Sequence, residues 1–249
     1  MRRAFVCLIS FAALTWGIAA MAQSAKAKKP AHKETFWEWA LRFSGISANP
    51  NTLKSAGDEP ASGQIWLADV TSGTTRKITP DTGYRSPVFS PDGASILALK
   101  GEDVIRISIA AARTEKLYSI SGISKLIGFC LDDTSEILVL QQPGQGTPVP
   151  AQLSITTGEI SPLPYDPNAS QDRQMLEHLQ GWQREYGTSI LYVKRENFQA
   201  LSGSIEIANV FLKIYDHDPQ NISHCDTVNC GQPSLSPDKT QVVFIKASP

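Results

Sequence analysis

The sequence predicts an all-β protein: a β-propeller of four blades, each with four antiparallel strands, closed by pairing of the N- and C-terminal hairpins. Three observations carry this prediction. Two kinds of hairpin alternate along the chain, each kind occurs four times, and the chain starts with one kind and ends on the other. A ring of four-stranded blades explains that order, because the last hairpin can pair with the first to complete one blade.

Hairpins of the first kind join an aromatic or apolar residue, a turn and a strongly apolar strand. They occupy residues 88–99, 128–140, 181–193 and 234–245. Their strands, such as "SILAL" and "QVVFI", are almost continuously apolar, which is typical of strands buried on both faces. We therefore expect this kind to form the inner half of each blade.

Hairpins of the second kind pair strands that alternate apolar and polar residues, as in "IWLADV". They occupy residues 65–79, 104–118, 151–164 and 210–223. Alternation is typical of strands with one wetter face, so this kind is predicted to form the outer halves. Hairpin 65–79 has no inner half before it, and we expect it to pair with hairpin 234–245. An eight-bladed ring shared by two chains satisfies the same pattern, so both a monomer and a homodimer stay open.

A Ser-Pro-Asp turn joins the strands of the first and last inner hairpins. Proline fixes φ, aspartate can bond its own backbone, and glycine tolerates positive φ. The structural turn residues are Pro91, Asp92, Gly93, Pro237 and Asp238. Lys239 stands where the first copy has glycine, so the last turn either avoids positive φ or is strained.

These hairpins resemble the TolB-like (WD40-like) β-propeller repeat over residues 64–248. The stretch from Ile65 to Leu99 follows the repeat pattern most fully, and the last copy follows it from Pro233 to Asp238. The resemblance implies a propeller that acts in the cell envelope by binding other proteins. The family form usually has six blades and a separate domain before them, whereas this chain has four predicted blades preceded by residues 23–63.

The N-terminal segment predicts export. Residues 1–22 have a basic start, an apolar run and the small-x-small sequence Ala20-Met21-Ala22, as in a cleaved signal peptide. The alternative is an uncleaved anchor. After cleavage we expect a periplasmic or secreted protein with no stable membrane insertion. Residues 23–63 are then a linker with a short amphipathic helix, and residues 64–249 are the propeller domain.

Two segments outside the repeat are predicted to be helical. Segment 33–46 carries aromatic residues that either pack against the propeller or reach a partner protein. Segment 169–180 is predicted to be a helical insertion with Ser170 as its N-cap and with Met175 and Leu179 facing the body. His178 in that segment is interpreted as a surface or packing residue.

The net charge bears on the kind of partner, and the cysteines bear on a disulfide bond. The formal net charge is -1, and about -3 without residues 1–22, which suggests no nucleic-acid partner. In an oxidising compartment Cys225 and Cys230 could form a disulfide, whereas Cys130 in "LIGFCL" is interpreted as a buried small hydrophobe.

The sequence has no nucleophile elbow, HExxH, Walker or dinucleotide glycine motif. We therefore expect no enzyme activity, no cofactor and no metal. One stretch, 215–230, is rich in potential metal ligands, although turns demand the same residue types. These potential ligands are Asp216, His217, Asp218, His224 and Asp226.

Loops that lead into the innermost strands surround the channel of a propeller, and exposed loops on a rigid scaffold commonly bind partners. The partner-binding candidates there are Tyr84, Arg85, Lys125 and Gln232. The predicted function is an exported, non-catalytic propeller that binds an envelope or secreted protein or serves as a scaffold. The alternative is a propeller enzyme, or a binder of a small saccharide or peptide at the channel.

Overall fold

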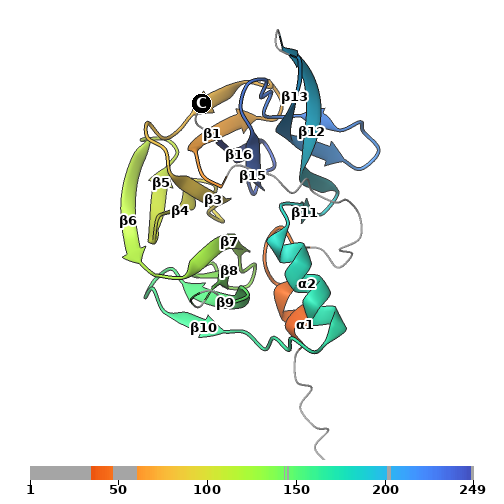
Figure 1. Ribbon diagram of the computed structural model, residues 1–249. Helices are drawn as coiled ribbons and strands as arrows, with labels where there is room; N and C mark the ends of the chain where they lie inside the picture. The colour runs from red at the N-terminus through yellow and green to blue at the C-terminus, as the bar shows by residue number, and fades with distance from the viewer. Residues whose placement is uncertain (1–34, 47–60, 143, 145, 201–202, 248–249) are drawn as a thin grey trace, which may run out of the picture. The chain divides into compact units, whose positions relative to one another are not determined.

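The computed structural model describes residues 35–46, 61–142, 144, 146–200 and 203–247 (Figure 1). The predicted signal peptide and most of the predicted linker lie outside these residues. The described strands form four antiparallel sheets of four strands each, in a propeller-like arrangement. We call each sheet a blade.

Three blades are continuous in sequence. The first contains β3 (Tyr84–Phe89), β4 (Ser95–Lys100), β5 (Asp103–Ser108) and β6 (Arg113–Ser119). The second contains β7 (Ile123–Phe129), β8 (Glu136–Gln141), β9 (Val149–Ser154) and β10 (Ile160–Pro162). The third contains β11 (Arg184–Tyr186), β12 (Ser189–Ala200), β13 (Gly203–Ile214) and β14 (Gln220–Asn221).

The composite blade joins the two ends of the described chain. Its strand order is β15 (Cys230–Leu235), β16 (Gln241–Lys246), β1 (Gln64–Asp69) and β2 (Thr75–Lys77). Strand β1 pairs antiparallel with β16 from Gln64 opposite Lys246 to Asp69 opposite Gln241. The pairing inferred from hairpin order is therefore made, and it is made within one chain.

Burial follows the two kinds of hairpin. The four central residues of β4, β8 and β16 are buried in each strand, because these strands are covered on both faces. Strand β2 is exposed along its whole length. Fully burying one large aliphatic or aromatic side chain stabilises a fold by about 1.5–3 kcal/mol, so the inner hairpins supply most of the hydrophobic stabilisation.

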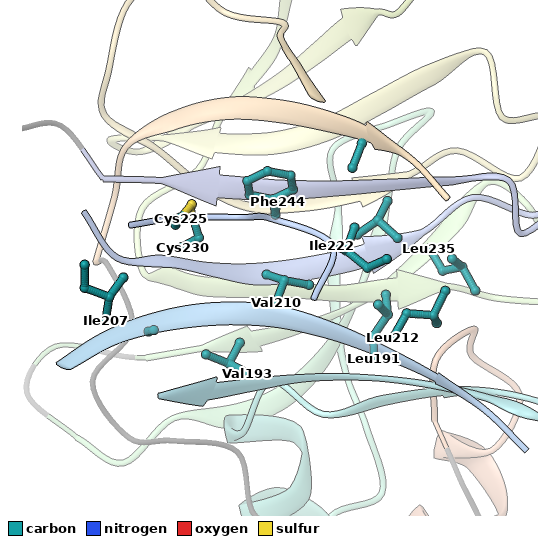
Figure 2. Packing of buried hydrophobic residues seen from close by; sticks show 13 residues of the cluster. Leu191, Val193, Ile207, Val210, Leu212, Ile222, Cys225, Cys230, Leu235 and Phe244 are labelled. Carbon is teal, nitrogen blue, oxygen red and sulfur yellow. A yellow bond between two sulfur atoms is a disulfide. The ribbon is translucent and has the colours of Figure 1, made fainter. Parts of the chain in front are cut away.

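Figure 2 shows how the third blade packs against the composite blade. Leu191, Val193 and Val210 project from β12 and β13 toward Leu235 and Phe244 of the composite blade. Every one of these side chains is buried. Apolar side chains facing each other from adjacent sheets are what hold neighbouring blades together.

The third blade departs from the predicted repeat. Strands β12 and β13 are each 12 residues long, and their hairpin reaches beyond the rest of the sheet (Figure 1). Its innermost strand, β11, has only three residues. The repeat pattern predicted the hairpins of this blade but not the length of the β12–β13 hairpin.

Helix α1 (Phe36–Ala40) is shorter than the predicted segment. Thr35 caps it, since the Thr35 hydroxyl accepts from the Glu38 backbone N–H at 3.3 Å and the Glu38 carboxylate accepts from the Thr35 N–H at 2.9 Å. Phe36, Ala40 and Phe43 are buried in a cluster with side chains of the second blade. The packing interpretation of these aromatic residues therefore holds for Phe36 and Phe43.

Helix α2 (Ser170–Gln180) begins one residue earlier than predicted. Ala169 is its N-cap and makes no side-chain capping bond, so the prediction of Ser170 as N-cap is wrong. The Asp172 carboxylate instead accepts from the Asp166 N–H at 2.8 Å and fixes the chain that enters the helix. Met175 and Leu179 are buried, as predicted. Neither helix in the described part of the chain has the length and apolar character needed to span a bilayer.

Candidate functional site

The ends of the inner strands surround a cavity of about 260 Å³, which we call the turn pocket. Its apolar lining comes from three blades and comprises Phe89, Pro91, Phe129, Leu131, Leu235 and Pro237 together with Cys130, which is free and buried as predicted. Its main polar groups are Ser44, Thr134, Tyr186, Ser234, Ser236 and Lys239. An apolar cavity with a few polar groups is the usual form of a ligand site.

The repeat explains why these residues converge. Phe89, Phe129 and Leu235 are the last residues of β3, β7 and β15, and an inner hairpin turn follows each of them. Strand β3 contacts both β7 and β15, so equivalent strand ends lie beside one another. Each blade therefore contributes the same kind of residue to one end of the inner strands.

The Ser-Pro-Asp turns beside the pocket are fixed by hydrogen bonds. In the first blade the Asp92 carboxylate accepts from the Ser90 hydroxyl at 2.5 Å and from the Ala94 N–H at 2.9 Å. The Ser90 hydroxyl holds the pKa of Asp92 below its usual value. In the last turn the Asp238 carboxylate accepts from the Ser236 hydroxyl at 2.6 Å. Both turns thus present a rigid rim to the pocket.

A segment before the first blade forms one wall of the pocket. We call residues 42–45 the strap. The Ser44 N–H donates to the Phe129 carbonyl at 2.8 Å, and the Arg42 carbonyl accepts from the Leu131 N–H at 2.7 Å. It also accepts at Gly45 C=O from Glu185 N–H at 3.2 Å. The strap is therefore bonded to the second blade on one side and to the third blade on the other.

Gly128 makes this close approach of the strap possible. A Cβ atom at Gly128 would collide with the Ser44 carbonyl oxygen, so only glycine leaves room for the strap beside β7. In contrast to the other neighbouring blades, the second and third share no extensive strand contact within the described chain. The strap occupies that position and brings Ser44 to the pocket.

Tyr186 joins the third blade to the composite blade at the pocket. Its hydroxyl accepts a hydrogen bond of 3.3 Å from the Leu235 N–H. The ring lies at the end of β11, so the short strand still reaches the inner strand ends.

Lys239 is the one side chain in the pocket lining that is charged at neutral pH. Its ammonium nitrogen lies 3.6 Å from the position that a Cβ atom would take at Gly187 in the β11–β12 turn. No ion pair of Lys239 is found within the described part of the chain. Its φ is +63°, close to the +70° of Gly93 in the equivalent turn, so the strained alternative for the last turn is correct.

The structure places the four partner-binding candidates at the beginnings of the inner strands, away from the turn pocket. Tyr84 is buried and donates to Asp81 at 3.2 Å. Gln232 is buried, and its carbonyl oxygen accepts from the Ser86 N–H at 2.6 Å. Burial raises the pKa of the Tyr84 phenol. The side chains of Tyr84 and Gln232 therefore make hydrogen bonds within the fold.

Lys125 and Arg85 join neighbouring elements in the same way. Lys125 is 5% exposed, and its ammonium donates to Gln180 C=O at 2.8 Å and lies 3.3 Å from the centre of the Trp182 ring. Arg85 donates to Gly101 C=O and to Ile123 C=O at 2.8 and 2.9 Å. Their observed role, with that of Tyr84 and Gln232, is structural, and a role in partner binding stays a prediction.

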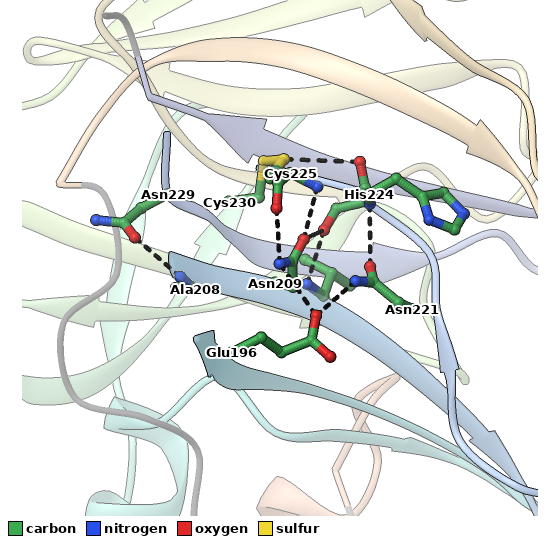
Figure 3. The surroundings of a disulfide bond; sticks show 10 residues. Glu196, Ala208, Asn209, Asn221, His224, Cys225, Asn229 and Cys230 are labelled. Carbon is green, nitrogen blue, oxygen red and sulfur yellow. Dashed lines mark hydrogen bonds between the residues drawn. A yellow bond between two sulfur atoms is a disulfide. The ribbon is translucent and has the colours of Figure 1, made fainter. Parts of the chain in front are cut away.

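Figure 3 shows the stretch that sequence analysis marked for potential metal ligands. Cys225 and Cys230 form a disulfide, and both are buried. The buried Asn209 amide accepts from the Cys225 N–H and from the Ser223 hydroxyl, each at 2.7 Å. The His224 imidazole points away from this network, whereas the His224 N–H donates to the Asn221 side chain at 3.0 Å. Within the residues that the structure describes, no three His, Cys, Asp or Glu side chains are grouped to hold a metal ion.

The comparisons with known proteins show limited similarity. No family model matches the chain, and no curated protein matches it. Among solved structures, a protein assigned as TolB from Agrobacterium tumefaciens is 16% identical with a TM-score of 0.36, and TolB from Acinetobacter baumannii is 18% identical with a TM-score of 0.36. An oligogalacturonate lyase in complex with manganese is 14% identical with a TM-score of 0.34.

The matched regions cover 74%, 74% and 75% of this chain in the same order. They cover 60%, 49% and 54% of those proteins, so the chain spans less than two thirds of their length. Similarity at this level describes a propeller-like fold at most, and the assignment of the fold here rests on the four sheets.

These neighbours correct one prediction. Because they include an oligogalacturonate lyase, a puromycin hydrolase and an acylaminoacyl peptidase, the prediction that the protein is not an enzyme is contradicted. The error was to treat four missing motifs, the nucleophile elbow among them, as evidence against all chemistry, whereas each of these motifs belongs to particular classes of enzyme.

Sequence reasoning also missed the turn pocket. It did not consider Ser44 or Tyr186. One signal was available, since Lys239 replaces a glycine of the repeat in the turn of the last inner hairpin.

Proposed function

We propose that the protein is an exported four-bladed propeller that binds another protein in the cell envelope and holds an apolar group of that partner in the turn pocket. The observation that carries the proposal is the pocket itself, where three blades and the strap converge on apolar side chains. A ring of blades fixes such a site rigidly, and rigid sites lose little entropy on binding.

Exposure at the rim of the pocket supports binding of a protein. Leu131 follows β7, lines the pocket and is 68% exposed, although leucine is usually buried. An exposed apolar side chain beside an apolar cavity extends the contact surface available to a partner. The disulfide between buried Cys225 and Cys230 fits an oxidising compartment, which supports export.

Site-specific photo-cross-linking tests the proposal. Benzoylphenylalanine would replace Leu131 in the full chain, made in cells from which it can be exported. The matched control is the same substitution at Tyr215, which is 75% exposed and lies outside the pocket lining. We expect a discrete cross-linked species from position 131 alone. Equal products at both positions, or none at position 131, would count against the proposal.

A further inference from the structure

We propose that the turn pocket binds the C-terminal residue of a peptide, with an apolar side chain inside the pocket and the terminal carboxylate on the ammonium of Lys239. This inference rests on the proposed function, because it takes the pocket to be a binding site. It adds the chemical class of the ligand and assigns a specificity-determining residue.

The first argument is charge. The lining supplies one ionised side chain, Lys239, and no carboxylate. The nearest acid in the same turn, Asp238, lies outside the lining, and its carboxylate accepts hydrogen bonds from Ser236 and Thr240. A group that enters the pocket therefore meets apolar walls, hydroxyl groups and one lysine, whose ammonium nitrogen lies beside Gly187 in the β11–β12 turn. An anion attached to an apolar group complements that combination.

The second argument is the backbone at Lys239. The equivalent turn of the first blade uses Gly93 at a φ of +70°, a conformation that glycine adopts without strain. Lys239 adopts a φ of +63° in spite of its side chain. Five other described non-glycine residues also have positive φ, Ala112 among them, so the φ of Lys239 alone assigns no function. Lys239 differs from Ala112 in that its turn lines the pocket, so its side chain can contact a ligand there.

The third argument concerns size and access, which favour a peptide over a small free acid. The turn pocket, at about 260 Å³, has room for one large apolar side chain. A second cavity of about 620 Å³ shares Pro91, Phe129 and Thr134 with it and extends past Leu97 to Arg106 between the first and second blades. The residues that precede a C-terminal residue can leave along this cavity.

Nuclear magnetic resonance titration of the isotope-labelled protein tests the inference with two peptides. One is acetyl-Gly-Ser-Gly-Ser-Phe with a free carboxylate, and the other is the same peptide with a C-terminal amide. We expect the acid to shift the signals of Phe89, Phe129 and Leu235. We expect the amide to bind about fivefold more weakly, since an exposed ion pair contributes up to about a fivefold change in affinity.

Substitution of the lysine gives a second readout. Lys239→Gly removes the charge and relieves the backbone, so we expect it to raise the midpoint of thermal unfolding by roughly 2–4 °C and to abolish the preference for the acid. Lys239→Gln should abolish the same preference without the gain in stability. Lys77→Gln, on the exposed strand β2, is the matched control and should leave the preference unchanged.

The outcomes separate the two proposals. If acid and amide bind equally, or if the Lys239 variants keep the preference, the inference about Lys239 is overturned while the pocket remains a binding site. If neither peptide shifts the pocket signals, the inference of a C-terminal peptide ligand is overturned, and the cross-link from position 131 decides the proposed function separately. If N-acetylphenylalanine binds as tightly as the peptide acid, the ligand is a small apolar acid and the peptide assignment is overturned.

Discussion

The Glu185 N–H donates a hydrogen bond of 3.2 Å to the Gly45 carbonyl, which ties the third blade to a segment that precedes the first blade in sequence. The adjacent Ser44 N–H donates to Phe129 in the second blade. Two blades without extensive strand contact of their own are therefore joined through the strap. Helices α1 and α2 pack together beside it (Figure 1).

Phe43→Ala should destabilise the protein by about 3–5 kcal/mol, because Phe43 is 1% exposed and its loss leaves a cavity beneath the strap. Urea denaturation followed by far-ultraviolet circular dichroism measures the change. Tyr215→Ala is the control, since this exposed side chain should contribute less than about 0.5 kcal/mol. A similar loss in both variants would contradict the structural role of the strap.

Removal of the disulfide should cost about 2 kcal/mol, since the bond closes a short loop with a sequence separation of 5. The double variant Cys225→Ser with Cys230→Ser should unfold at a lower temperature than the unchanged protein. Dithiothreitol should lower the unfolding temperature of the unchanged protein and leave that of the double variant unaltered. An unchanged protein that is insensitive to the reductant at its unfolding midpoint would argue against the bond.

His178 should make stability depend on pH between about 4 and 6.5. Burial lowers the pKa of this imidazole from 6.5 to about 4, so the folded protein holds it neutral. The unfolded chain takes up the proton at higher pH, and stability is therefore complete above pH 6.5 and is lost as the pH falls toward 4. Denaturation of His178→Gln at pH 5 and pH 7.5 should show a smaller difference than the unchanged protein. An equal difference would contradict this burial.

Asp92 should stabilise the first inner turn only while it is ionised. The Ser90 hydroxyl and the Ala94 N–H hold the pKa of this carboxyl below 3.8. Its contribution is therefore present above about pH 4 and is lost as the pH falls through the lower folded pKa. Asp92→Asn should be less stable than the unchanged protein at pH 7, and the two should converge in acid. Asp216→Asn, in an exposed turn, is the control for general charge effects.

Much of the fold could be predicted because the repeat is defined by hydrophobic patterns and turn residues that are close together in the sequence. The apolar run at 95–99 predicts a strand in the inner half of a blade, and the alternation of apolar and polar residues at 65–69 predicts a strand in the outer half. The pairing of β1 with β16 followed from the order of the hairpins alone. The 12-residue strands of the third blade were missed, because polar residues such as Lys194 and Glu196 do not mark where a protruding hairpin ends.

The predicted partner-binding residues lie at the beginnings of the inner strands, whereas the turn pocket lies at the opposite ends of those strands. Tyr84 and Lys125 have the side chains of interface anchors, yet their polar groups are bonded to Asp81 and to the carbonyl groups at the end of α2. Residue type alone does not tell whether a hydroxyl or an ammonium faces solvent or a carbonyl, because that depends on which chain segments are packed beside it.

The sequence by itself determined the sheets, the division into inner and outer hairpins and the closure between the chain ends, since hydrophobic period and turn chemistry act over a few residues. Only the tertiary structure decided that Ser44, Phe129, Tyr186 and Lys239 line one pocket. These residues lie far apart in the chain, and no local pattern relates them. They meet because the blades stack side by side and the strap takes the place of a direct contact between two of them.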